Sequence, residues 1–509
     1  MAIEPAKRAR RKRALGVGLL LVPSALFSIL GGCEYVSNLG YYTSTDAGTP
    51  DGGGGGEEGC TACGTRCCPS GTACVDGRGE GVCEHDVVEL SPGVESACAV
   101  LADGTLWCWG GNQYGTIGVG PEGDDSCIFT GDHVACRFKP VQVEGLRNVV
   151  QVSSGERYTC AVERDDSVWC WGRNDDGVLG HAPGTSGDHM CPANLDGGPD
   201  AEPCNATPQR VPGLSAVTVA TSTDHTCVIE ADASVDCWGS NSSGGLGDPS
   251  IDGGVSTPHR VLGLPPVSQV SVGTIHSCAI AADGGGVWCW GRDSSGQLGH
   301  PADLDHEDNG LASYTPLPVT TPVVQGDASV PEPFTGAVSV RVGFPFSCAL
   351  RGDRTVWCWG GSVFGTLGTV DDRVQRSPVQ MQKLGAARAI DTRFAHVCTL
   401  IDNGSVSCWG DDYLGELGQG GIAVTRCSTS GQPCSPTPQT VVTLSNQIAV
   451  ATGTGFSLSL GDDHRTIWAW GSNDTARLGH TPKSDGDFIN CADNLQSVCN
   501  PVPRAFIIR

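Results

Sequence analysis

The sequence predicts an all-β protein, and more narrowly a seven-bladed β-propeller of four-stranded blades. Three observations point to this fold class. The 509 residues include 73 glycines and 31 prolines but only 3 methionines, a balance that favours short strands and turns over helices. A motif of the form WCWG occurs seven times along the chain, with the variants DCWG, SCWG and WAWG at three of the seven positions. All 12 tryptophans lie inside these motifs, so they mark a repeat of β character.

Residues 1–32 are predicted to be a lipoprotein signal peptide. A basic run over residues 7–13 precedes an apolar stretch over residues 14–30, which is the charge order of an export signal. The stretch ends in LGGC and resembles a bacterial lipobox, so Cys33 is the expected site of lipidation. An ordinary signal peptide or a signal anchor is the alternative. We therefore expect an exported lipoprotein at the cell envelope, at the outer membrane or cell surface, that touches the membrane through its lipid only.

The charge of the chain excludes one class of partner. The formal net charge is −25, and removal of the six basic residues and one glutamate of the signal peptide leaves −30. Such an acidic surface repels phosphate backbones, so no nucleic-acid partner is expected.

Two short regions precede the repeats. Residues 33–59 are polar, end in the run DGGGGGEEG, and are predicted to be a flexible linker. Residues 60–84 hold six cysteines and almost no large apolar residues, so we predict a small module with three disulfides, of which fifteen pairings are possible. The alternative is zinc held by the C-x2-C at Cys60 and Cys63.

Residues 85–509 are predicted to form the propeller. Within one repeat, VVQVSSG (149–155), YTCAV (158–162) and SVWCWG (167–172) each have the pattern of a strand. A fourth strand is expected from the P-x-x-V segment ahead of each unit, such as PQRV from Pro208. Four strands make a blade, and seven blades close into a ring.

The ends of the chain suggest how this ring closes. The first unit begins at Val87 without a preceding P-x-x-V segment, while PVPRAFIIR from Pro501 has no following unit. We expect the C-terminal segment to complete the blade that begins at Val87, which would remove two open sheet edges.

The cysteine of the motif is expected to bond across its own hairpin. A second cysteine lies ten residues before it in five units and eleven residues before it in a sixth, with turn-forming residues between. In the seventh unit both positions change together, to Leu458 and Ala469. The predicted hairpin disulfides are Cys98–Cys108, Cys160–Cys170, Cys227–Cys237, Cys278–Cys289, Cys348–Cys358 and Cys398–Cys408.

Eight more cysteines pair within single loops. These predicted loop disulfides are Cys127–Cys136, Cys191–Cys204, Cys427–Cys434 and Cys491–Cys499. Since every thiol then has a local partner, no cysteine is left as a nucleophile. Catalysis would otherwise need a cluster of arginines with paired carboxylates or a tyrosine in one pocket, and the sequence offers none, so we expect no catalytic residue, no cofactor and no metal ligand. The acidic loops at 303–310 and 174–177 lack the ligand spacing of an EF-hand, so a solvated acidic surface is favoured over calcium sites.

The later tryptophan of each motif is present in all seven units, whereas the earlier one is replaced by Asp236 or Ser407. We expect the later tryptophans to fill the space between neighbouring blades, and the earlier position to lie nearer solvent. The alternative is an aromatic ring that binds a ligand. The later tryptophans are Trp109, Trp171, Trp238, Trp290, Trp359, Trp409 and Trp470.

With these residues assembled, the repeats resemble the regulator of chromosome condensation family of seven-bladed propellers. GTIHSCAIAADGGGVWCWGRDSSGQLG, residues 273–299, shows the family pattern of a histidine, a D-G turn, W-G and G-x-L-G. The resemblance implies the fold. The nuclear exchange activity of the best-known member is not expected of an exported acidic chain, whereas an inhibitor-like binding role, as in exported bacterial relatives, fits the compartment. Aromatic residues replace the histidine in several units, which implies that this position serves packing.

The function is expected where the units differ. From the L-G glycine to the next P-x-x-V the length varies from 10 to 28 residues, and all these loops leave from equivalent points, so they gather on one face of the ring. We predict a protein-binding or scaffold module with an unidentified envelope or extracellular protein as partner. The alternatives are loops without a partner, and a carbohydrate-active hydrolase or lyase with its site at the mouth of the central channel.

Overall fold

The structure is a computed structural model whose described part lies within one compact unit, Ser37–Arg509. It describes residues 60–63, 66–69, 83–120, 125–129, 132–192, 201–300, 312–325, 328–369, 373–423, 425–427, 431–484, 486–489, 491 and 497–508. The predicted signal peptide 1–32, Cys33 and the linker 33–59 lie outside these residues. Among the described residues no helix is long and apolar enough to cross a membrane.

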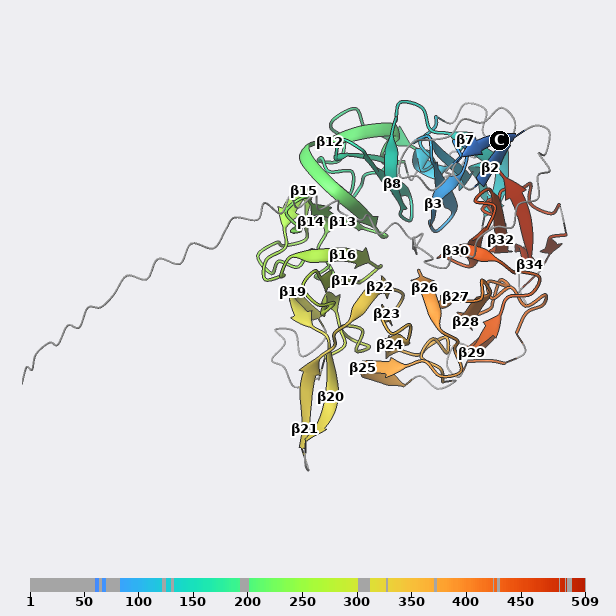
Figure 1. Ribbon diagram of the computed structural model, residues 1–509. Coiled ribbons are helices and arrows are strands. Elements are labelled where there is room, and N and C mark those ends of the chain that lie inside the picture. Colours follow the sequence, from blue (N-terminus) through green and yellow to red (C-terminus); the bar gives the residue numbers. More distant parts are fainter. Residues whose placement is uncertain are drawn as a thin grey trace, which may run out of the picture. The chain divides into compact units, whose positions relative to one another are not determined.

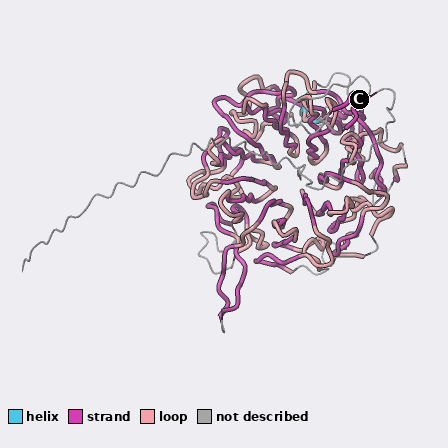
Figure 2. The backbone as a smooth tube through the Cα atoms, viewed as in Figure 1, coloured by secondary structure: helices cyan, strands magenta, loops and turns pink. Residues whose placement is uncertain are grey.

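Seven four-stranded antiparallel units, numbered here in chain order, surround a common centre (Figures 1 and 2), which confirms the all-β propeller. The first strands lie nearest the centre and are β3 (Val87–Pro92), β8 (Val149–Ser154), the end of β12 (Glu202–Thr221), β16 (Val267–Val272), β22 (Ala337–Val342), β26 (Ala387–Thr392) and β30 (Gln447–Thr452). The second strands are β4 (Ser96–Leu101), β9 (Tyr158–Glu163), β13 (His225–Glu230), β17 (His276–Ala281), β23 (Phe346–Arg351), β27 (His396–Ile401) and β31 (Phe456–Gly461).

The third strands carry the tryptophan motif and the fourth strands form the outer rim. The third strands are β5 (Leu106–Gly111), β10 (Ser167–Arg173), β14 (Val235–Ser240), β18 (Val287–Arg292), β24 (Val356–Gly361), β28 (Val406–Asp411) and β32 (Thr466–Ser472). The fourth strands are β7 (Asp132–Gln142), the start of β12, β15 (Gly254–Arg260), β19 (Ala312–Pro318), β25 (Val374–Gln380), β29 (Cys434–Thr440) and β34 (Val498–Ile507). β12 is shared by units 2 and 3.

The P-x-x-V segments do not belong to the units that follow them, contrary to the expectation. Each is the fourth strand of the unit that precedes it, so Trp169 of β10 pairs with Arg210 of β12. In the same way the C-terminal strand β34 pairs with β32 of unit 7, with Trp468 opposite Ala505, and the Val87 sheet takes β7 as its fourth strand. The physical reason is local: after each motif the chain turns back and pairs antiparallel with the strand it has just left.

Buried tryptophans join neighbouring units, as predicted. All seven later tryptophans are 0% exposed. Each indole Nε1 donates a hydrogen bond of 2.7–3.0 Å to a backbone carbonyl in the G-x-L-G turn of the preceding unit, as from Trp171 to Thr116 O. The earlier tryptophans are partly exposed, which confirms the second part of the expectation. One aromatic residue per unit thus supplies both apolar packing and a fixed register between blades.

Units 7 and 1 are joined by the same contact. Trp109 Nε1 donates to Arg477 O at 3.0 Å, and the rings of Trp109 and Phe506 meet edge to face with centroids 5.4 Å apart. Val87 N donates to His464 O at 2.7 Å, and apolar residues of both units share one core cluster. Phe506 lies on β34, so the C-terminal strand contributes to this junction through a side chain and not through backbone pairing.

Several elements lie outside the repeating pattern. Short strands β6 (Asp125–Phe129), β11 (His189–Cys191) and β33 (Phe488–Ile489) extend units 1, 2 and 7. An arm of two strands, β20 (Thr320–Gln325) and β21 (Ala328–Pro333), follows unit 4. The described part of the cysteine-rich module 60–84 includes the paired strands β1 (Cys60–Cys63) and β2 (Arg66–Pro69), and its Cys83 is disulfide-bonded.

Candidate interaction face

The two ends of the ring carry different loops. Inner loops join the first strand of a unit to the second, and outer loops join the third strand to the fourth. Because the strands are antiparallel, both sets lie at one end, here called the loop face. The hairpins that join second and third strands lie at the opposite end, the hairpin face. Backbone bonds tie the two sets on the loop face together, as from Gly111 N to Glu95 O at 2.8 Å.

The hairpin face is nearly uniform. In six of the seven hairpins an Asp or Asn side chain accepts a hydrogen bond from the backbone N–H two residues later, at 2.8–3.1 Å. This bond closes the turn and satisfies a donor that would otherwise need water. The residues that accept it are Asp103, Asp165, Asp232, Asp353, Asn403 and Asp463.

The structure brings all ten predicted cysteine pairs together as disulfides. The six hairpin disulfides join directly opposed residues whose Cα atoms are 4.1–4.2 Å apart. The four loop disulfides join residues whose Cα atoms are 5.9–6.1 Å apart. All four lie on the loop face, in units 1, 2, 6 and 7. In unit 7 the hairpin positions Leu458 and Ala469 stay opposed and pack in the core that joins units 7 and 1.

Three of the loop disulfides hold an exposed apolar side chain. Ile128 on β6 is 43% exposed, Met190 on β11 is 60% exposed and Phe488 on β33 is 55% exposed. Each lies within three residues of a loop cysteine, in units 1, 2 and 7 respectively. Scattered exposed apolar residues are ordinary, but one on each of three neighbouring cross-linked excursions indicates a contact surface.

These excursions overlap the units before them. Cys127 and Cys136 of unit 1 pack with Ala476 of unit 7, and Cys191 and Cys204 of unit 2 pack with Tyr114 of unit 1. Strand β12 of unit 2 passes so close to Gly115 that a Cβ on this residue would clash with Ala206; the φ of Gly115 is +74°. The loops of units 7, 1 and 2 therefore form one continuous arc, here called the loop arc.

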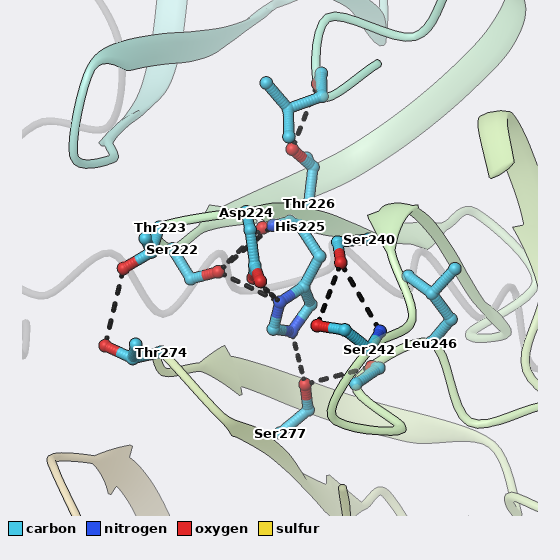
Figure 3. Close-up of polar contacts among 12 residues, drawn as sticks. Ser222, Thr223, Asp224, His225, Thr226, Ser240, Ser242, Leu246, Thr274 and Ser277 are labelled. Carbon is cyan, nitrogen blue, oxygen red and sulfur yellow. Dashed lines mark hydrogen bonds and ion pairs between the residues drawn. The ribbon is translucent and has the colours of Figure 1, made fainter. Parts of the chain in front are cut away.

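An Asp–His–Ser arrangement lies below the inner loop of unit 3 (Figure 3). His225 Nδ1 lies 3.1 Å from Asp224 Oδ1, and its Nε2 lies 2.9 Å from Ser277 Oγ. The geometry resembles a hydrolase triad, but Ser277 is 0% exposed and its hydroxyl donates to Gly245 O. No substrate atom can reach a nucleophile buried in this way.

The same histidine contact recurs in two other units, without the aspartate. His276 Nε2 and His396 Nε2 each lie 2.8 Å from a serine hydroxyl of the next unit, Ser347 and Ser457. Burial lowers the pKa of His276 and of His396 to about 3, so both rings are neutral. The histidine position is therefore a joint between blades, which agrees with the packing role inferred from the sequence.

Carboxyl groups on the loop face are buried close to one another. Asp411, Asp412 and Glu416 of unit 6 are 8%, 0% and 2% exposed. Burial, followed by the charge of Glu416, raises the pKa of Asp412 to about 8, and burial also raises the pKa of Asp411 and of Glu416. In unit 2 burial and the neighbouring acids raise the pKa of Asp176 to about 6. The loop face of unit 6 therefore holds three buried carboxyl groups whose charged forms are disfavoured.

Metal-ligand groupings among the described residues are sparse. His189, Cys191 and Cys204 lie within reach of one another, but the two sulfurs are bonded to each other; Glu84, His85 and Asp103 form a second group. In the acidic loop 174–177, Asn174 Oδ1 accepts a hydrogen bond from Leu179 N at 3.1 Å, so this side chain holds the turn. The loop 303–310 lies outside the described residues.

Comparison with known proteins settles the family. The RCC1-like domain model matches residues 135–492, and models of the regulator of chromosome condensation (RCC1) repeat match residues 103–162 and 87–116. The chain belongs to the RCC1-like domain family. This agrees with the resemblance seen in its repeats.

Relatives and solved structures bear out the fold. The chain is 28% identical over 295 residues to the RCC1 domain-containing protein RUG3 of Arabidopsis thaliana and 27% identical over 258 residues to the human regulator of chromosome condensation. The first match covers 57% of each chain, and the second covers 49% of this chain and 55% of the other, so the chain spans little more than half of either relative. Yeast RCC1 (Prp20) bound to Kap60 aligns with a TM-score of 0.60 at 19% identity, over 84% of this chain and 85% of that one.

Two features of the structure were not predicted from the sequence. One is the arm β20–β21, although a Gly-Asp pair between valine-rich runs at residues 320–333 is a hairpin signal. The other is Arg393, which stands in the inner loop of unit 6 where five other units have glycine. That break in the glycine pattern was the available signal.

Proposed function

We propose that this RCC1-like propeller is a lipid-anchored binding module of the cell envelope, and that it binds another protein through the loop arc of units 7, 1 and 2. The observation that carries the proposal is the set of exposed apolar side chains, Ile128, Met190 and Phe488, on disulfide-held excursions of neighbouring units.

Rigidity lowers the entropic cost of binding at such a surface. A loop that is ordered before binding loses less conformational entropy when a partner arrives, and each loop disulfide fixes an excursion of 7–13 residues. Apolar anchors on an otherwise acidic surface supply the desolvated centre that protein interfaces need.

The relatives support a binding role. One solved neighbour is yeast RCC1 (Prp20) bound to Kap60, and another is Prp20p of Saccharomyces cerevisiae, which has binding properties to Gsp1p and histones. Those partners belong to those proteins. For this chain we propose an extracellular or envelope protein, because the LGGC sequence at Cys33 predicts export and the net charge of −25 disfavours a nucleic acid.

Cross-linking to a captured partner tests the proposal. The full chain, oxidised and purified in detergent, is mixed with solubilised envelope and secreted proteins of its source, and cross-links are mapped to residues. We expect cross-links to cluster beside Cys127, Cys191 and Cys491. Cross-links confined to the hairpin face, or retention of glycans without any protein, would overturn the proposed surface.

Mass spectrometry of the N-terminal peptide tests the anchor separately. The expected result is a diacylated Cys33 at the N-terminus of the purified chain. An unmodified Cys33 within an intact leader would contradict lipid anchoring and leave the binding surface untouched.

A further inference from the structure

Unit 6 carries acids at two positions where no other unit has one. Asp411 stands where units 3 and 7 have Ser240 and Ser472, and Glu416 stands where unit 4 has Gln297. The two carboxyl groups lie within hydrogen-bonding reach of each other, and the residues are only 8% and 2% exposed. Unit 6 therefore holds two neighbouring carboxyl groups in a place that water barely reaches.

The polar contacts of this pair are incomplete. Glu416 Oε2 accepts a hydrogen bond from Leu414 N at 2.7 Å. Asp411 Oδ1 is buried without a hydrogen-bond partner in the described part of the chain. Asp412 has a different role, because both of its carboxylate oxygens accept hydrogen bonds from backbone N–H groups and hold the turn. What is missing beside Asp411 is a donor or a cation.

Other buried acids of the ring show how such a charge is compensated. Burial raises the pKa of Glu89 and of Glu95, and the charges of Arg341 and Arg477, respectively, oppose this shift. The two acids of unit 6 have no such neighbour: among the described residues, no arginine, lysine or histidine pairs with either of them or acts on their charge.

Unit 7 shows a positive charge at the equivalent place. Arg477 corresponds to Glu416, because the backbone carbonyl of each accepts a hydrogen bond from the buried tryptophan of the next unit. The guanidinium Nη1 of Arg477 donates to Val94 O at 3.0 Å and to Thr454 O at 3.1 Å, which belong to the inner loops of units 1 and 7. One junction of the ring thus holds a fixed cation where the neighbouring junction holds carboxylates.

We infer that the Asp411–Glu416 pair is a metal site, which takes a calcium ion. Two carboxylates balance the charge of a divalent cation, and oxygen donors without nitrogen or sulfur select hard cations over zinc or copper. Burial favours Ca²⁺ over Mg²⁺, because Mg²⁺ gives up its water reluctantly. Since only two side chains supply ligands, backbone carbonyl oxygens and water complete the coordination. The site lies outside the loop arc and does not depend on the proposed function.

Calorimetric titration with calcium chloride tests the inference. The full chain is freed of metal with a chelator, desalted, and titrated in about 0.15 M NaCl, which screens weak attraction of cations to the acidic surface. We expect one site with a dissociation constant on the order of 0.1–1 mM, as in extracellular calcium modules, and at least tenfold weaker binding of magnesium. No saturable calcium binding, or equal binding of magnesium, would overturn the assignment.

Substitutions borrowed from other units locate the site. Glu416→Gln installs the residue of unit 4, where Gln297 Oε1 accepts from the backbone N–H two residues earlier at 2.8 Å, so the turn is expected to survive. Asp411→Ser installs the residue of units 3 and 7. Each substitution is expected to weaken calcium binding at least tenfold. Unchanged calcium binding in either variant, with a parental melting curve, would refute the site.

Two exposed acids away from the loop face serve as matched controls. Glu144→Gln and Asp283→Ser make the same exchanges, and both variants are expected to bind calcium as the parent does. Calcium should also raise the melting temperature of the parent and the controls but not of Asp411→Ser, because an ion that binds only the folded chain stabilises it. An equal loss of binding in controls and site variants, or an equal melting shift in all of them, would assign calcium to the acidic surface as a whole and contradict the site.

Discussion

The two faces of the ring differ in how much the seven repeats vary. On the hairpin face, six of seven turns repeat one Asp or Asn contact, and six hairpins carry the same disulfide. On the loop face, the excursions differ from unit to unit, and exposed apolar side chains lie on disulfide-held loops. The uniform face repeats one way of closing a turn, whereas the variable face is where the units differ and where we place the proposed contact surface.

Two acids, one on each face, show how their surroundings set the ionisation of a carboxyl group. On the hairpin face, hydrogen bonds from Thr355 lower the pKa of Asp353 because they favour the charged carboxylate. On the loop face, burial and like charges raise the pKa of Asp412 to about 8. A carboxyl group thus stabilises a turn at one face and is held as a neutral acid at the other.

The largest expected effect comes from removing two disulfides separately, one buried inside a blade and one on the loop face. Cys98→Ala/Cys108→Ala removes a buried hairpin staple and should destabilise the fold by about 2–4 kcal/mol, without changing the contact surface. Cys127→Ala/Cys136→Ala should instead weaken partner binding, since it frees the excursion that holds Ile128. Thermal melting and partner affinity are measured on both variants; equal effects of the two on both quantities would erase the distinction between the faces.

The next largest effect is expected from Asp412, one of the buried acids of the loop face. Asp412 Oδ1 accepts a hydrogen bond from Leu417 N at 3.2 Å, and four other units have asparagine at this position. Asp412→Asn therefore keeps this acceptor but loses the one that Oδ2 offers to Ala423 N at 2.5 Å. A raised carboxyl pKa means that stability falls as pH rises from about 4 to about 8. The lost hydrogen bond acts at both pH values, so we expect the stability of Asp412→Asn relative to the parent to rise by on the order of 1–2 kcal/mol from pH 4 to pH 8, in unfolding curves at both pH values.

A matched substitution gives the opposite sign. Asp293 occupies the same position in unit 4, but it pairs with Arg376 Nη1 at 2.8 Å. Asp293→Asn should therefore lose stability at pH 8. A gain in this variant as well would show that the position, and not the crowding of acids in unit 6, controls the result.

The smallest effect is expected on the hairpin face. Asp353→Ala removes the bonds to Thr355 N and Thr355 Oγ1 and should cost about 1 kcal/mol. Because the pKa of Asp353 is lowered, its contribution is present above the ordinary aspartate pKa and is lost as pH falls below it. Urea unfolding at pH 7 and pH 3 checks this: the difference between Asp353→Ala and parent should be smaller at pH 3 than at pH 7, and a constant difference would contradict the assignment.

Local periodicity made much of the fold predictable. The spacing of Cys98 and Cys108 places them opposite each other across one hairpin, and alternation along the strand then turns Trp109 toward the next blade. Both inferences need only contacts within a single unit. The fourth strand was assigned to the following unit because each P-x-x-V segment stands between two motifs, and the sequence does not show which neighbour it pairs with.

The candidate sites were less accessible to sequence reasoning. Arg393 of unit 6 and Pro92 of unit 1 meet only when the ring is assembled. The exposure of Ile128, Met190 and Phe488 likewise depends on how each excursion lies on its neighbour. Local pairing explained the loop disulfides, whereas the surface they support is a property of the assembled face.

The central claim is that the loop face binds the partner and the hairpin face does not. The most direct test is the dissociation constant of the captured partner for Ile128→Lys/Met190→Lys/Phe488→Lys and for Leu262→Lys/Val338→Lys. The latter changes residues that are 64% and 49% exposed near the hairpin face. We predict at least a hundredfold loss for the first variant and parental affinity for the second. Parental affinity for the first, with loss for the second, would contradict the account.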